Sequence, residues 1–89
     1  MVDNELVSEH LAANVVRLLA ARSMSMRALA AATGEAPMTI SRICRGLTLP
    51  SIAVAMRIAE AFDVSLDRLV APPPAPTEDA ERKNSKRSA

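Results

Sequence analysis

Hydrophobic residues recur along most of this chain at intervals of three and four positions, the spacing that places side chains on one face of an α-helix. The clearest case is Leu11, Val15, Leu18 and Leu19, which predict one buried stripe on a helix over about residues 8–22. The strict alternation of apolar and polar residues that indicates a β-strand is absent from the sequence. The pattern therefore predicts an all-α protein.

Capping and helix-breaking residues divide the rest of the chain into four shorter helices. Serine side chains cap helix N-termini well, proline fits the first helical position, and glycine ends a helix in the left-handed conformation. Residues of the first two kinds stand where helices could begin: Ser25, Pro37, Ser51 and Ser65. The helices predicted after the first span about residues 26–33, 37–45, 51–62 and 66–70.

The composition changes after Ala71, where four prolines fall within five positions and a small, polar segment follows. Such a segment has too few apolar residues to form a core. We therefore expect one compact five-helix domain over residues 1–71 and a disordered tail over residues 72–89. The basic residues near the end of the tail could contact phosphates or simply aid solubility.

The formal net charge of +1 hides an uneven distribution. Residues 10–50 contain five arginines and one acid, a local balance of 5 − 1 = +4, whereas the other acids lie mainly on either side. A basic stretch within a nearly neutral chain suits a polyanionic partner such as nucleic acid. A solvated arginine-rich face would give the same count, so charge alone leaves both interpretations open.

The inventory of reactive residues argues against an enzyme, a metal site or a bound cofactor. The chain has one histidine and one cysteine, and it has no glycine-rich phosphate loop and no paired carboxylates in a plausible pocket. So small a chain also offers no evident pocket for a small-molecule effector. No run of about 18 apolar residues indicates a membrane span, and the N-terminus does not resemble a secretory signal. We expect a cytoplasmic protein.

The predicted helix over residues 37–45 has two faces of different character. At about 100° per residue, Ile40, Ile43 and Cys44 fall on one side and predict an inward face. The outward face carries the remaining larger or polar side chains: Pro37, Met38, Ser41, Arg42 and Arg45. Such a helix could enter the major groove of DNA, where an arginine can bind guanine through two hydrogen bonds. An ordinary amphipathic helix with a wet face is the alternative.

Residues 14–70 resemble the lambda-repressor-like Cro/XRE family of bacterial and phage regulators. The segments that carry the resemblance are SMSMRALAAATG (23–34), MTISRICRG (38–46) and LPSIAVAMRIAEAFDVSLDRLV (49–70). Each segment is a weak match alone, but all three occur in order and without a gap. The resemblance implies a helix-turn-helix domain, in which two short helices joined by a tight turn present the second helix to double-stranded DNA.

The resemblance also assigns expected roles to individual residues. Those expected to read bases are Pro37, Met38, Ser41 and Arg42. Those expected to contact phosphates are Ser25, Met26, Arg27, Thr39, Arg45 and Thr48. The resemblance further implies a homodimer, with an interface expected at Val64, Leu66, Leu69 and Val70. These residues could instead belong to the core, which is the more expected place for Leu66 and Leu69.

Several positions depart from the family pattern. Met26 replaces a frequent glutamine, Ala36 replaces a polar cap, and Glu35 stands where the family is usually apolar. A carboxylate beside DNA would be repelled unless it accepted a hydrogen bond from N4 of a cytosine, and of these two alternatives we expect Glu35 to point away from DNA. The frequent arginine–glutamate pair is replaced by Leu19 and Cys44, which favours a packing role for Cys44 over a redox role.

These observations predict a sequence-specific transcriptional regulator, acting as a repressor and associated with the nucleoid when bound. An antitoxin that binds a toxin and its own promoter is the alternative, because some antitoxins resemble the same family. In that case the tail would fold against the toxin.

Overall fold

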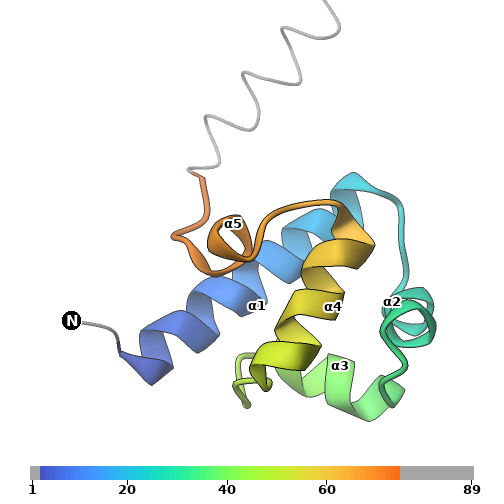
Figure 1. Ribbon diagram of the computed structural model, residues 1–89, viewed down its shortest axis with the longest axis horizontal. Coiled ribbons are helices and arrows are strands. Elements are labelled where there is room, and N and C mark those ends of the chain that lie inside the picture. The colour runs from blue at the N-terminus through green and yellow to red at the C-terminus, as the bar shows by residue number, and fades with distance from the viewer. Residues whose placement is uncertain (1–2, 75–89) are drawn as a thin grey trace, which may run out of the picture.

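The computed structural model describes residues 3–74, which form five α-helices and no strand (Figure 1). The helices are α1 (Asn4–Ala21), α2 (Met26–Thr33), α3 (Pro37–Cys44), α4 (Ile52–Phe62) and α5 (Leu66–Val70). The prediction of an all-α, five-helix domain is therefore confirmed. No helix within the described residues has the length and apolarity needed to cross a bilayer.

Serine caps set the starts of three helices, as the sequence predicts. The side chain of Ser25 accepts a hydrogen bond from the backbone N–H of Ala28 at 3.0 Å, and Ser51 and Ser65 cap α4 and α5 in the same way. Each cap satisfies one of the backbone donors that have no partner within the first turn of a helix. Gly34 ends α2 in the left-handed region, with φ at 75°.

The first helix begins earlier than the sequence pattern predicts, at Asn4 rather than near residue 8. The cap is Asp3, whose side chain accepts a hydrogen bond from the backbone N–H of Glu5 at 2.9 Å. The side chains of residues 3–6 are exposed, so no apolar period marks this first turn. The third helix ends one residue early, because Arg45 serves as its C-cap.

The core is formed by buried side chains from all five helices. All four residues of the predicted α1 stripe are buried. The side chains that join them with less than 2% exposure include Leu29, Ile40, Ile43, Ile58, Phe62 and Leu69. Helix α1 packs against α3 and α5, whereas α2 packs against α3 and α4. This arrangement places α3 and α5 on opposite sides of the molecule (Figure 1).

The buried amide of Asn14 holds the short helix α5 against α1. Its Nδ2 donates to the carbonyl oxygens of Leu69 at 2.8 Å and Ala71 at 2.7 Å, with a longer contact to that of Arg68 at 3.4 Å. These carbonyls belong to the last turn of α5 and its C-cap, where no intrahelical donor remains. A five-residue helix is too short to persist alone, so these contacts and the burial of Leu69 stabilise it.

The expected disordered tail falls largely outside the described residues. Only residues 72–74 of that segment are described, and they continue from α5 without helical structure.

Candidate functional site

Helix α3 is attached to the core by one face and leaves the other free. The side chains of Ile40 and Ile43 are fully buried, which confirms the predicted inward face. Pro37 occupies the first turn, and Ala36, the N-cap residue, makes no side-chain hydrogen bond to the helix. The first backbone donors of α3 therefore lack the side-chain partner that Ser25 provides for α2.

The residues expected to read bases lie together on α3. Pro37, Met38 and Arg42 are exposed, and the side chain of Met38 is 64% exposed. Ser41 is half-buried between this surface and the core side of the helix. The exposed surface of α3 thus combines one long cation with apolar groups near the helix start.

The residues expected to contact phosphates come from three parts of the chain: the start of α2, α3 with its C-cap, and the loop after α3. Ser25, Met26 and Arg27 are exposed at the start of α2, and Thr39 and Arg45 lie on α3 and at its C-cap. Thr48 is half-buried in the loop that follows. The oxygen of Ser25 already accepts the cap hydrogen bond from Ala28, so this hydroxyl is left as a donor to an external oxygen.

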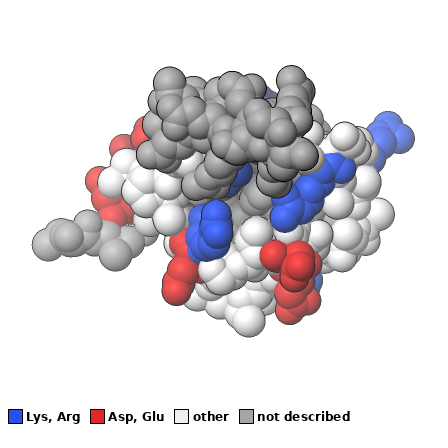
Figure 2. Space-filling view, turned by 90° about the horizontal axis from the view of Figure 1, so that it is seen from above, with Lys and Arg blue, Asp and Glu red and all other residues white. Residues whose placement is uncertain are grey.

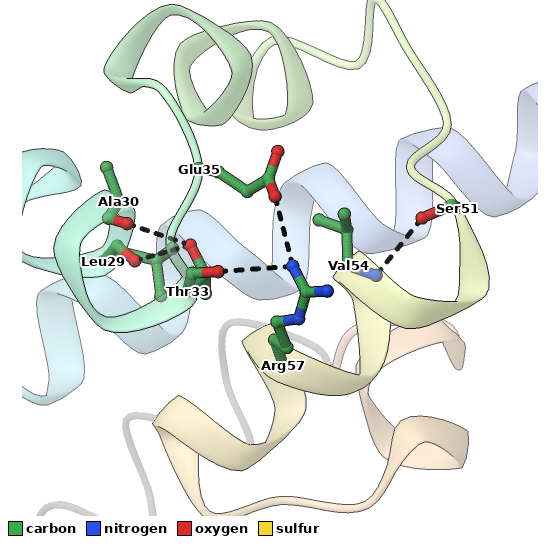
Figure 3. Close-up of polar contacts among 7 residues, drawn as sticks. All are labelled: Leu29, Ala30, Thr33, Glu35, Ser51, Val54 and Arg57. Carbon is green, nitrogen blue, oxygen red and sulfur yellow. Dashed lines mark hydrogen bonds and ion pairs between the residues drawn. The ribbon is translucent and has the colours of Figure 1, made fainter.

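An ion pair beside α3 was not foreseen from the sequence. The Oε2 atom of Glu35 lies 3.3 Å from the NH1 atom of Arg57, which comes from α4 (Figure 3). The same NH1 atom donates to the backbone oxygen of Thr33 at 3.5 Å. The Glu35 carboxylate is thus turned toward α4. Arg57 is 22 positions away in the sequence, and no local pattern connects the two residues.

The described part of the face opposite α3 differs in charge pattern from the exposed surface of α3. Figure 2 views that face, and acidic and basic side chains are mixed on it where its residues are described. Mixed charge of this kind favours a solvated surface over the binding of a polyanion.

The residues expected at a dimer interface require one correction. Leu69 is fully buried in the core of the domain, so its side chain is not available to a partner. Val64, Leu66 and Val70 are half-buried. More exposed large apolar side chains occur in the α3–α4 loop and on α4: Leu47, Leu49, Ile52 and Met56.

Cys44 packs against the hydrophobic core and is half-buried. Burial raises the pKa of its thiol, because the apolar surroundings disfavour the thiolate. Leu19, the other half of the altered family pair, is buried. The expected packing role of Cys44 agrees with these surroundings. Among residues 3–74, the side chains of His, Cys, Asp and Glu form no group that could hold a metal ion.

Comparisons with known proteins extend these observations. The family model described as "Helix-turn-helix" matches residues 16–69, which include α2, α3 and the turn between them. The crystal structure of a hypothetical transcription factor, NHTF, from Neisseria has the same fold, with a TM-score of 0.72 at 21% sequence identity. The alignment covers 92% of this chain and 91% of that one. No curated protein sequence matches the chain.

Proposed function

Since the chain belongs to the Cro/C1-type helix-turn-helix family of DNA-binding regulators, we propose that it is a sequence-specific repressor. In this proposal it binds its operator as a homodimer, and α3 of each subunit enters the major groove. The observation that carries the proposal is the two-sided construction of α3. Ile40 and Ile43 fix the helix to the core, while Arg42 and Met38 extend from its free surface.

Arg42 is the main base-reading residue in this proposal. Its guanidinium can donate two hydrogen bonds to O6 and N7 of guanine, the commonest specific contact of arginine in the major groove. Pro37 and Met38 can offer only apolar contacts, for example to a thymine methyl group. Ser41 can add a weaker polar contact from the edge of the same surface. Hydrogen-bond reading of sequence would therefore depend strongly on one side chain.

Phosphate contacts would fix the position of α3 in the groove. Arg27, at the start of α2, and Arg45, the C-cap of α3, are exposed cations, and Ser25 and Thr48 carry hydroxyl groups that can donate to phosphate oxygens. Contacts of this kind orient a protein on the duplex but carry little sequence information. Met26 and Thr39 would contribute backbone or hydroxyl contacts beside them.

Dimerisation would compensate for the small surface that one domain offers to DNA. The three half-buried residues of the α5 region, Val64, Leu66 and Val70, remain our proposed contact between subunits. Val70→Asp should then shift the protein to a monomer in sedimentation experiments, whereas Ile52→Asp, on exposed α4 surface, should not. The reverse result would move the interface to the apolar side chains of the α3–α4 region.

Selection of bound sequences from random duplexes, followed by one pair of variants, tests the proposed function. Arg42→Ala should weaken binding to the selected operator by about 1–3 kcal/mol and relax the preference at one or two positions of each half-site. Arg68→Ala, which removes an exposed arginine from α5 on the opposite side of the domain, is the matched control. Equal losses for the two variants, or no selected sequence at all, would contradict the proposal.

A further inference from the structure

Glu35 poses an electrostatic problem for a helix that approaches DNA. It is the only acid within residues 25–48, and it lies two positions before Pro37, the first residue of α3. Double-stranded DNA carries one negative charge for about every 1.7 Å of its length. A free carboxylate at the start of α3 would lie within about one Debye length (~10 Å at 0.1 M salt) of several phosphates and would repel them.

The charge of Glu35 is compensated by a side chain from outside the helix-turn-helix pair, that of Arg57. Arg57 of α4 places NH1 3.3 Å from Oε2 of Glu35 and 3.5 Å from the backbone oxygen of Thr33 (Figure 3). Thr33 is the last residue of α2, and its carbonyl lies at the negative end of the helix dipole. One nitrogen atom of Arg57 therefore links the end of α2 to the segment that leads into α3.

Thr33, which accepts the hydrogen bond from Arg57, is buried and hydrogen-bonded within α2. Thr33 is 3% exposed, and its hydroxyl donates toward the carbonyl oxygens of Leu29 at 2.9 Å and Ala30 at 3.2 Å within α2. Leu29 is fully buried in the core. The carbonyl that Arg57 contacts is thus part of the fixed frame of the domain, whereas Glu35 belongs to the turn between the two helices.

The ion pair is poorly suited to a purely stabilising role. The side chain of Arg57 is 51% exposed and that of Glu35 is 23% exposed. Solvent-exposed ion pairs contribute little to folding stability, because water screens the charges and two side chains must be ordered. A larger effect is expected where a strong external field acts on the carboxylate, and the phosphates of a duplex would supply such a field.

We infer that Arg57 is a positioning residue for DNA binding. It neutralises Glu35 and holds the α2–α3 turn to α4, so that the first turn of α3 can approach the phosphate backbone. This inference rests on the proposed function. It requires no contact between Arg57 and DNA, which separates Arg57 from Arg27 and Arg45.

The experiment measures binding of the full chain to its selected operator by fluorescence anisotropy. Arg57→Gln should weaken binding about three- to tenfold, the effect of one uncompensated charge at about 8 Å from two or three phosphates in water. Arg68→Gln removes the same charge from the opposite side of the domain and should change affinity less than about twofold at moderate salt. Arg57→Lys keeps a cation that can reach both oxygens and should bind like the parent protein.

A double variant and the salt dependence distinguish positioning from direct contact. Glu35→Gln with Arg57→Gln removes both charges and should restore affinity to within about twofold of the parent, because no carboxylate remains to repel the duplex. The slope of log K against log salt should be the same in this double variant as in the parent, since its net charge is unchanged and each lost phosphate contact would reduce the slope by about 0.9. A reduced slope in the double variant, or a double variant as weak as Arg57→Gln, would overturn the inference.

The remaining outcomes separate this inference from the proposed function. If the parent protein binds its operator and Arg42→Ala behaves as proposed, but Arg57→Gln matches Arg68→Gln, then the inference alone is wrong. If the parent selects no sequence, the proposed function itself fails. Thermal unfolding followed by circular dichroism checks each variant, and Arg57→Lys and the double variant keep the test decisive should Arg57→Gln fold poorly.

Discussion

Helices α2 and α3 have the same length of eight residues, yet their ends are capped differently. At the N-terminus of α2 the Ser25 side chain is a cap, and at the C-terminus Gly34 adopts the left-handed conformation. At the N-terminus of α3 there is no side-chain cap, and its outer surface holds Met38 and Arg42. Helix α2 thus begins at a side-chain cap, whereas α3 begins without one at the end proposed to meet DNA.

The buried faces of α2 and α3 should contribute similarly to folding stability. Substitutions on these faces should have the largest effect on the free energy of unfolding. Leu29→Ala in α2 and Ile43→Ala in α3 each remove a fully buried side chain, so each should lower the free energy of unfolding by about 2–5 kcal/mol. Urea denaturation measures the loss. Where the alanine variants do not fold, Ile43→Val should cost about 0.5–1.5 kcal/mol. A loss below this range would mean that α3 is not anchored by its isoleucines.

The difference in capping predicts that substitutions at the two helix starts change the free energy of unfolding in opposite directions. Ser25→Ala should lower the free energy of unfolding by about 1 kcal/mol, because it removes the hydrogen bond to the N–H of Ala28. Ala36→Ser should raise it by about 0.5–1 kcal/mol, since the backbone of Ala36 already has the extended conformation of an N-cap. The same urea experiment measures both. Two variants of equal stability would remove the proposed contrast between the helix starts.

The outer cations should affect DNA binding without changing sequence preference. Arg27→Ala on α2 and Arg45→Ala at the end of α3 should each weaken binding to specific and random duplexes alike and reduce the salt slope by about one unit. Binding titrations between about 50 and 200 mM salt measure this slope. If Arg45→Ala changes the preferred base at any position, Arg45 belongs with the base-reading residues instead.

The smallest expected effect concerns Cys44, at the inner edge of α3. Burial raises the pKa of its thiol, so near neutral pH the thiol remains protonated and should react slowly with a disulfide reagent. Its rate in the folded protein should be below that of the same chain unfolded in urea. Because the folded state favours the protonated thiol, stability should also decrease as pH rises above the ordinary thiol pKa. Equal rates in both states would show that packing does not protect Cys44.

Much of the fold could be predicted because its signals are local. Serine caps, the left-handed glycine and the apolar period of α1 each act within about one helical turn, so the sequence displays them directly. The start of α1 was missed because Asp3 caps a turn whose side chains are all exposed. On α4, Ile52 and Met56 fit an apolar helical period and are nevertheless exposed, because periodicity does not show which part of a broad apolar face a neighbour covers.

The polar contacts between helices could not be predicted from the sequence, because the residues that form them are far apart in the chain. Asn14 and Ala71 are 57 positions apart, and Glu35 and Arg57 are 22 positions apart. Each contact depends on how whole helices pack, which no local spacing encodes. In the candidate site, the position of α3 residues on a helical wheel indicated which side chains are exposed. The same reasoning left open whether Leu69 belongs to the core or to an interface, and it did not show that Arg57 accompanies Glu35.

The contact between Asn14 and Ala71 has a practical consequence for protein engineering. Because it fastens the C-terminal end of α5 to α1, the backbone at Ala71 leaves the domain on the side away from α3 (Figure 1). A fluorescent protein or a second binding module joined at this point would begin on the side of the domain away from α3. Such a fusion should leave α3 sterically free, which makes this end a suitable attachment site for microscopy or for chimeric regulators.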